Sequence, residues 1–409
     1  MESILTSRAM CEVLPTTTSV QDCCANSDVV MARQCTCQDC VVVASKGSIV
    51  SERPRRLASP GDIVTIDLTL TPENGLVPEP LFDRMGIITF VVGRGYLPAL
   101  HELVQNKGVG DQVQHVSVDA GWGERNEDLV MELPKSKLRR FLKHDGNLPD
   151  VGSILNLHGG IQLAVTKVNM EEETVVVDAN PPLAGASYDC SFTVMSIDDA
   201  PLDFVGASGM ADVQPQSPSI HSKYQVSTWA LGCFWGGELA FMRTPGVVGT
   251  RVGYTQGVVR NPSYEDVCTG KTRHREAIMV VYDPNIVSYQ ELMKVALERL
   301  AATNNPSNSN SPFHNNNNIN NGDSMFGGLF AEEEADQVVN QQYHHGFYYH
   351  SEEQREMAEQ ELRKNGNLYN IEIKEATAFY DAEEYHQQYL LKGGQSARKG
   401  AKETIRCYG

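Results

Sequence analysis

The chain has 409 residues, more than one hydrophobic core usually holds, so we expect two or three domains. Its formal net charge of −18 argues against nucleic acid as the main partner. No apolar run reaches the ~18 residues of a membrane span, and the N-terminus lacks the pattern of a secretion signal. We therefore expect a cytoplasmic protein without a membrane partner. An organellar location such as the plastid stays open, because residues 1–50 contain Ser and Thr and few acids.

Residues 1–55 show no sustained periodicity, and we predict a disordered segment there. Six of the ten cysteines lie in its first 40 residues. We expect thiols in a reducing compartment rather than a disulfide scaffold. "CTCQDC" (35–40) has no second Cys pair or His at zinc spacing, so we predict no metal site. Exposed thiols are the first interpretation, and a redox or metal sensor is the alternative.

Residues 56–200 are rich in predicted β-strands, separated by Gly and Pro. Apolar and polar residues alternate with the period of two that is typical of half-buried strands. The runs are "DIVTIDLTL" (62–70), "QVQHVSV" (112–118), "TVVVDA" (174–179) and "DCSFTVMSI" (189–197). Residues 201–222, which contain "GASG" and "QPQSPS", are predicted to be a linker.

Residues 223–409 alternate between predicted strands and helices. "YQVSTWAL" predicts a strand that leads through "GCFWGG" (232–237) into a helix ending near residue 242. Ser351 and Gln354 form a capping-box pattern that opens a helix to about residue 365. The later segments are a strand at 276–283, an amphipathic helix at 289–300, a strand at 369–376 and a helix containing "EEYHQQYL".

An asparagine-rich stretch interrupts this second half. Ten of the eighteen residues from Asn304 to Asn321 are asparagine, and such a tract cannot bury a core. We predict a disordered insert over residues 303–328.

"GCFWGG" places a thiol at the start of a predicted helix. Unpaired N–H groups and the helix dipole at that position favour a thiolate at Cys233. The glycines allow a tight turn and leave room for a substrate to approach. Phe234 and Trp235 offer an apolar wall suited to a small group such as a methyl. The alternative is an inert cysteine in an aromatic core.

Longer motifs follow in a specific order, and together they resemble one enzyme family. They are "GCFWGGE", "RTPGVVGTRVGYTQG", "NPSYEDVCTGKTRHREA", "VVYDP", "QQY", "ATAFYDAEEYHQQYL" and "IRCYG". From about residue 225 to 409, apart from the insert, the chain closely resembles plant-like type A peptide methionine sulfoxide reductases. The resemblance implies an α/β-plait (ferredoxin-like) reductase domain over residues 223–409.

The resemblance also implies roles for individual residues. Cys233 would attack the sulfoxide sulfur of methionine-S-sulfoxide and become a sulfenic acid while methionine is released. Glu276 matches the family's acid, with a pKa raised by apolar surroundings. Tyr264 and Tyr343 match tyrosines that bind the sulfoxide oxygen, and the apolar wall matches the methyl pocket. Outside this motif, a solvated glutamate and packed tyrosines would be the simpler interpretation.

A second thiol is needed to resolve the sulfenic acid. Cys407 of "IRCYG" matches a recycling cysteine, and its disulfide would be reduced by thioredoxin, or by dithiothreitol in vitro, with no bound cofactor. Ala401 stands where plant-like relatives usually carry another cysteine, so a single Cys233–Cys407 exchange is expected. Cys268 lies on a predicted core segment and is interpreted as structural.

Two departures from the family pattern lie near the expected rim of the site. Val338 occupies the position of a usual aspartate, and Asp336 lies two residues away. "TNNP" and the insert replace an "HDP"-like segment. We expect reduced turnover or altered substrate access.

The β-rich half resembles FKBP-type peptidyl-prolyl isomerases of the SlyD-like branch. The matching segments are "SPGDIVTIDLTL", "LFD", "FVVGRGYLPAL", "KGVGDQV", "DAGWGERNEDLVMELP" and "VDANPPLAG". The resemblance implies an antiparallel β-barrel type of fold with an inserted lobe near residues 134–180 that binds unfolded chains. Phe82 and Asp83 match the isomerase pocket, and Trp122 and Leu68 stand where tyrosines are usual. Isomerase activity and client holding are both open.

The main hypothesis is therefore a multidomain α+β chain that joins an FKBP-like folding domain to a reductase. Its partners would be thioredoxin and oxidised or unfolded protein clients. A folding factor with a weak or inactive reductase half is the alternative.

Overall fold

The computed structural model describes residues 55–74, 81–93, 97–143, 145–156, 162–205, 221–303 and 341–406. It also gives the short paired strands β1 (Val43–Ser45) and β2 (Ser48–Val50). The chain divides into two units, Met1–Arg55 and Arg56–Gly409. The six N-terminal cysteines, the asparagine-rich insert, Val338 and Cys407 lie outside the described residues.

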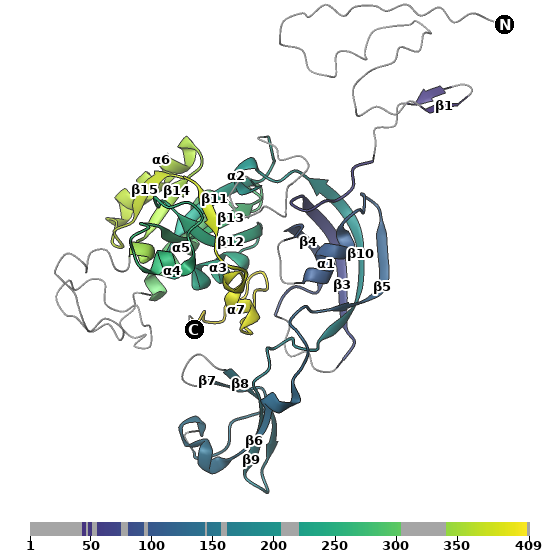
Figure 1. The fold of residues 1–409 in the computed structure, drawn as a ribbon, viewed down its shortest axis with the longest axis vertical. Coiled ribbons are helices and arrows are strands. Elements are labelled where there is room, and N and C mark those ends of the chain that lie inside the picture. The colour runs from purple at the N-terminus through teal and green to yellow at the C-terminus, as the bar shows by residue number, and fades with distance from the viewer. Residues whose placement is uncertain are drawn as a thin grey trace, which may run out of the picture. The chain divides into compact units, whose positions relative to one another are not determined.

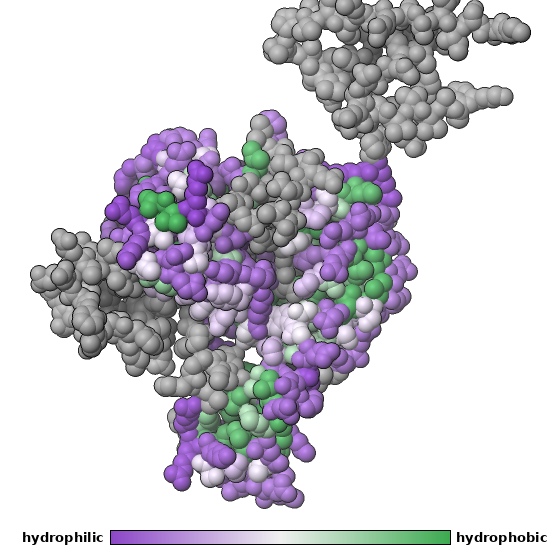
Figure 2. Space-filling view, in the orientation of Figure 1, coloured by the Kyte–Doolittle hydropathy of each residue, from purple (hydrophilic) through white to green (hydrophobic). Residues whose placement is uncertain are grey.

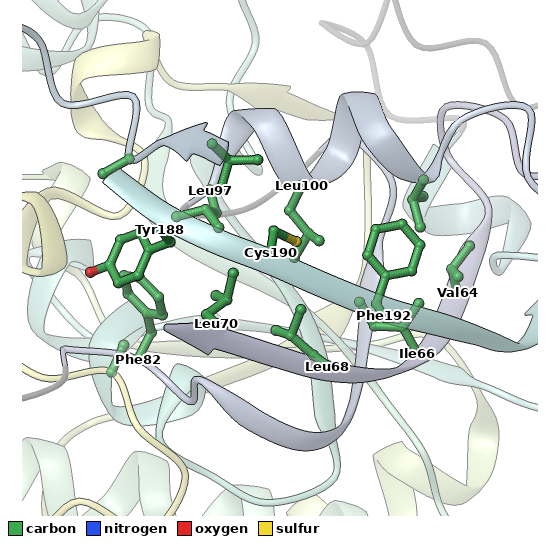
Figure 3. Packing of buried hydrophobic residues seen from close by; sticks show 14 of the residues in the cluster. Val64, Ile66, Leu68, Leu70, Phe82, Leu97, Leu100, Tyr188, Cys190 and Phe192 are labelled. Carbon is green, nitrogen blue, oxygen red and sulfur yellow. The ribbon is translucent and has the colours of Figure 1, made fainter. Parts of the chain in front are cut away.

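An antiparallel sheet forms the centre of residues 56–200, here called the first half. Its order is β4 (Met85–Val91), β3 (Ile63–Pro72), β10 (Ser187–Asp198) and β5 (Gln112–Asp119). Alternate residues of β3 turn inward, and Leu68 and Leu70 pack with Leu100 of helix α1 (Pro98–Val104), as Figure 3 shows. Cys190 lies in the same core, where burial raises the pKa of its thiol to about 11, so this cysteine is chemically inert.

A second, smaller sheet is inserted between β5 and β10 (Figure 1). Three 3₁₀ turns (Glu127–Leu129, Lys135–Lys137 and Arg139–Phe141) accompany its strands. The strand order is β6 (Val130–Pro134), β9 (Thr174–Asp178), β8 (Gln162–Asn169) and β7 (Ile154–Asn156). This inserted lobe has its own core: Leu138, Leu148, Leu155, Leu163, Val165, Val175 and Val177.

A six-stranded sheet forms the centre of residues 223–409, here called the second half. Its order is β15 (Glu372–Glu375), β14 (Gly346–Tyr349), β11 (Gln225–Ala230), β13 (Arg275–Tyr282), β12 (Val247–Thr255) and β16 (Phe379–Asp381). Helix α3 (Phe234–Met242) follows β11, and α5 (Tyr289–Thr303) follows β13. The four inner strands are antiparallel and have the strand order of an α/β plait.

Both faces of this sheet are buried, because alternate residues of β13 pack into different hydrophobic clusters. Ile278 and Val280 join the cluster of α3 and α5, while Met279 and Val281 face the other way. On that other face they cluster with Val91 of β4 in the first half and with Phe204 of helix α2 (Leu202–Val205), at the start of the predicted linker. The start of the predicted linker is therefore part of a core that both halves share.

One predicted helix is broken because tertiary contacts compete with it, and another forms with a changed cap. "EEYHQQYL" forms a 3₁₀ turn (Glu384–His386) and a short helix α7 (Tyr389–Lys392), separated at Gln388, whose φ is 54°. The Gln387 side chain is used to bind the backbone of Val252 and Ala382. The predicted helix that ends near residue 365 is confirmed as α6 (Glu352–Asn365), and Ser351 caps Gln354 as expected. The return bond of the capping box differs, because the Gln354 side chain accepts from the backbone N–H of His350.

The predicted strand at 369–376 is confined to Glu372–Glu375. Among the helices within the described ranges, none is long and apolar enough to cross a membrane.

Candidate active site

Cys233 lies at the N-terminus of α3, half-buried, after a sharp turn out of β11. Gly232 makes the turn with a left-handed φ of 79°, which glycine adopts without strain. Gly237 has a different role from the one expected. A Cβ there would lie 2.7 Å from Cδ1 of Ile278, so this glycine lets α3 pack closely on β13. The thiol thus occupies a helix N-terminus that is fixed against the sheet.

Glu276 lies at the start of β13, directly across from Tyr254 of β12. Its side chain is almost fully buried at 2% exposure, and Oε2 accepts a hydrogen bond of 3.3 Å from the backbone N–H of Phe234. Burial raises the pKa of Glu276 to about 8. The carboxyl group is therefore mostly protonated at neutral pH, beside the helix turn that carries Cys233.

Two tyrosines lie near this pair. Tyr343 ends the 3₁₀ turn Gln341–Tyr343, and burial, with further contributions from Glu276, Tyr264 and Cys233, raises its pKa. Tyr264 begins helix α4 (Tyr264–Cys268), and burial also raises its pKa. Both hydroxyls therefore stay protonated and can donate hydrogen bonds to an oxygen atom.

Cys268 lies at the end of α4 and is half-buried, so it does not belong to a core segment as predicted. Its thiol and the hydroxyl of Tyr264 influence each other's pKa. Burial raises the pKa of this thiol, which keeps it in the unreactive thiol form.

Phe234 and Trp235 form an aromatic corner beside Cys233. Phe234 is buried, Trp235 is half-buried, and their ring centroids lie 6.3 Å apart. The indole of Trp235 stacks on Tyr389 of α7 at 4.1 Å. Trp235 Nε1 donates a 3.2 Å hydrogen bond to Nδ1 of His386. Contacts on two sides thus fix the indole.

His386 is a site residue that the sequence interpretation did not single out, although "EEYHQQYL" contains it. Its ring lies 5.3 Å from that of Phe234 and 4.7 Å from that of Tyr264. Burial lowers the pKa of His386, so the imidazole is neutral. Since an indole N–H only donates, Nδ1 must accept and the ring proton lies on Nε2.

Glu383 connects two elements beside the site, strand β12 and helix α4. Its carboxylate accepts from the hydroxyl of Tyr254 at 2.9 Å and from the backbone N–H of Tyr264 at 2.9 Å. These and other hydrogen bonds outweigh desolvation and lower the pKa of Glu383. Glu383 is therefore an ionised hydrogen-bond acceptor and not a second acid.

In the part of the chain that the structure describes, no three His, Cys, Asp or Glu side chains form a group that could hold a metal ion. The chemistry available at this site is that of the thiol, the acid and the tyrosines.

Phe82 and Asp83, which match an isomerase pocket, are covered by other parts of the chain. Phe82 is 1% exposed and lies 5.9 Å from Tyr188 between ring centroids. The backbone N–H of Lys399, from the second half, donates to Asp83 at 3.2 Å. Trp122 is half-buried and packs against the same core. The C-terminal segment of the chain therefore covers the place where a proline peptide was expected.

The fold and the site define a class of protein: a thiol enzyme with a plait fold, whose cysteine at a helix N-terminus is paired with a buried, protonated carboxylic acid. The family model "Peptide methionine sulfoxide reductase" matches residues 225–317 and 330–405. The chain belongs to this family.

Two plant relatives agree with that assignment. Peptide methionine sulfoxide reductase A4, chloroplastic, from Arabidopsis thaliana is 40% identical over 222 residues, which are 50% of this chain and 76% of the relative. Peptide methionine sulfoxide reductase A2 from the same plant is 41% identical over 190 residues, 45% of this chain and 77% of the relative. A solved structure, methionine sulfoxide reductase A of Corynebacterium diphtheriae, is 30% identical, with a TM-score of 0.30, covering 42% of this chain and 75% of that one.

Proposed function

We propose that this protein reduces methionine-S-sulfoxide in peptides, and free methionine-S-sulfoxide as well, to methionine. The observation that carries the proposal is the pairing at one helix turn: Cys233 at the N-terminus of α3, and the buried acid Glu276 bonded to the next backbone N–H. Family membership supports the same reaction.

In the first step, the Cys233 thiolate attacks the sulfur of the sulfoxide. The S–O bond polarises, and the oxygen takes the proton of Glu276 while the tyrosine hydroxyls stabilise the developing charge. The oxygen then passes to Cys233, which becomes a sulfenic acid, and methionine leaves. The sulfoxide gains two electrons and the cysteine loses two. The aromatic corner of Phe234 and Trp235 accepts the methyl group on the sulfur.

In the second step, the thiol of Cys407 attacks the sulfenic sulfur of Cys233. An S–S bond forms, the S–OH bond breaks, and the hydroxyl leaves as water with the thiol proton. Thioredoxin, a dithiol partner, then reduces the disulfide, so no bound cofactor is needed. A reducing compartment suits this cycle, whether cytoplasm or plastid.

The test of the reaction is an assay in which each epimer of a peptide-bound methionine sulfoxide is supplied separately with dithiothreitol. The S epimer should be consumed and the R epimer should remain. Consumption of neither would leave a folding factor with an inactive reductase half.

Replacing Cys407 tests the resolving step. In Cys407→Ser, one equivalent of methionine should form at the normal rate, because the attack uses Cys233 alone. Turnover driven by thioredoxin should fall by about 100-fold or more, since the serine hydroxyl cannot form the disulfide. Turnover driven by dithiothreitol should persist, because a small thiol can reduce the sulfenic acid directly. Unchanged turnover with thioredoxin would assign resolution to another thiol.

A client-binding role for the first half is a second candidate, and the surface of the inserted lobe favours it. Figure 2 shows apolar side chains gathered over this lobe, and the exposed ones include Met131, Val151, Ile154 and Met170. Because Phe82 and Asp83 are covered, we favour the holding of unfolded clients over prolyl isomerisation. Bound clients would present their oxidised methionines to Cys233.

Point substitutions test this role better than deletion, because the two halves share a core. The double variant Val151→Lys/Met170→Lys should slow repair of an unfolded, oxidised protein by about threefold to tenfold, since each lysine removes apolar contact area. Reduction of a short peptide should not change. Glu171→Lys, an exposed position in the same lobe, is the matched control. Equal slowing of peptide and protein repair would contradict the client role.

A further inference from the structure

The C-terminal segment closes on itself just before Cys407. The side chain of Gln395 donates from Nε2 to the carbonyl of Arg406 at 2.6 Å, and its Oε1 accepts from the Arg406 N–H at 2.9 Å. Residues 395–406 are therefore a closed loop of the kind called an Ω-loop, here named the anchoring loop. Cys407 is the next residue of the chain, so this pair fixes the point from which it departs.

The closed end of the anchoring loop is bonded to α7, the short helix that packs on the aromatic corner of Phe234 and Trp235. The N–H of Gln395 donates to the carbonyl of Leu390 in α7 at 2.9 Å. The neighbouring residue Tyr389 stacks on Trp235, two residues after Cys233. Arg406 is thus bonded to Gln395, and Gln395 is bonded to the short helix that supports the wall of the active site.

Arg243, at the C-terminal end of α3, holds the loop from inside the second half. Its Nε donates to the carbonyl of Ser396 at 2.7 Å, and its Nη1 donates to that of Glu403 at 2.6 Å. Its own carbonyl accepts from the N–H of Gly400 at 2.7 Å. Since Arg243 is buried at 7% exposure, these charge-assisted bonds are shielded from water.

The first half supplies a second anchor. The N–H of Ala397 donates to the carbonyl of Leu81 at 2.7 Å, and the N–H of Lys399 donates to the carboxylate of Asp83 at 3.2 Å. Ala397 is buried in the core of the first half, and Ile405 packs against it. The Lys399 ammonium donates to the carbonyls of Met242 and Val247, so the same residue joins both halves.

We propose that the first half positions the resolving cysteine: Leu81 and Asp83 hold the anchoring loop, so that Arg406, the residue before Cys407, is fixed beside α7. This proposal rests on the resolving role of Cys407 given above. A fixed departure point raises the effective concentration of the second thiol at the sulfenic acid, because fewer residues remain free to search. Asp83 and Gln395 are positioning residues, and neither touches the substrate.

A single-turnover experiment on the full chain tests this proposal. The enzyme receives one equivalent of a peptide methionine-S-sulfoxide, and two rates are measured: methionine release, and loss of the second thiol as the disulfide forms. In Asp83→Ala and in Gln395→Ala, release should keep its rate, while disulfide formation should slow by about fivefold to tenfold. Asp83→Asn keeps an acceptor oxygen and should restore most of the rate. Asp67→Ala, an exposed carboxylate on β3, is the matched control.

The outcomes separate this inference from the proposed function. Normal disulfide formation in both Asp83→Ala and Gln395→Ala, beside a block in Cys407→Ser, would overturn the positioning role and leave the reductase intact. A disulfide that still forms in Cys407→Ser would remove the resolving role of Cys407 and the positioning proposal with it. Equal slowing of release and disulfide formation would mean general damage to the fold, and it too would contradict a role confined to the second step.

Discussion

Cys233→Ser is expected to lose reduction of methionine-S-sulfoxide by more than about 10³-fold, the scale seen when a nucleophile is removed. A serine hydroxyl at the N-terminus of α3 remains protonated at neutral pH and is a far weaker nucleophile than a thiolate. It also cannot take up the sulfoxide oxygen as a sulfenic acid. The measurement is chromatographic separation of the two sulfoxide epimers of a peptide, with dithiothreitol as the reductant.

The matched control for this substitution is Cys268→Ser. Among the cysteines that the structure describes, Cys268 is the other half-buried one, and its thiol interacts with the Tyr264 hydroxyl. A serine there keeps a hydrogen-bonding group of similar size, so activity should stay within about threefold. Activity retained in Cys233→Ser but lost in Cys268→Ser would reverse the assignment of the nucleophile. Consumption of the R epimer by the unaltered protein would contradict the proposed stereochemistry.

Local patterns in the sequence predicted the strands and the turn that carries Cys233, because both depend on neighbours along the chain. The period-two alternation of β3 and β10 follows from one buried face, and the structure confirms both strands. "GCFWGG" predicted a turn into a helix, and Gly232 makes that turn at the N-terminus of α3. The continuous apolar run of β13 indicates a strand covered on both faces, although it cannot indicate by what.

The sequence could not predict features that depend on distant partners. Gln387 leaves the helical path because its side chain is bound by β12, 135 residues earlier in the chain. The contact between Lys399 and Asp83 joins residues 316 apart and lies where the motif predicted an isomerase pocket. His386 was missed for the same reason: its importance comes from rings supplied by two other segments, α3 and α4. The roles of Phe82 and Gly237 likewise depended on what packs against them.

Glu276→Gln should lower the rate of methionine formation by about 10²–10⁴-fold, the usual contribution of a general acid. Glutamine fits the same space and can still donate a hydrogen bond, but it has no proton to transfer. The pH dependence gives a second readout. The protonated acid is the active form, so the unaltered protein should lose activity as pH rises through about 8, the pKa of Glu276. The residual activity of the glutamine variant should lack this alkaline loss.

The same raised pKa predicts that Glu276, although it supports activity, lowers the stability of the folded protein. The ordinary value for a glutamate is 4.5, and burial raises it to about 8 in the folded protein. Below pH 4.5 Glu276 is protonated in both the folded and the unfolded state, so its raised pKa does not lower the free energy of unfolding. As pH rises from 4.5 to 8 the unfolded state loses the proton while the folded state keeps it, and the folded protein becomes progressively less stable.

Glu276→Gln should therefore raise the free energy of unfolding by about 1–3 kcal/mol at pH 8, and by much less near pH 4.5. Urea unfolding of both proteins at the two pH values measures the difference. Gln354→Glu, which would add a carboxyl group to another buried position, should show the reverse trend. A variant that is inactive yet gains no stability at high pH would mean that Glu276 is ionised in the resting protein. In that case the proton for the sulfoxide oxygen would have to come from Tyr264 or Tyr343, and the alkaline loss of activity would move to their higher pKa values.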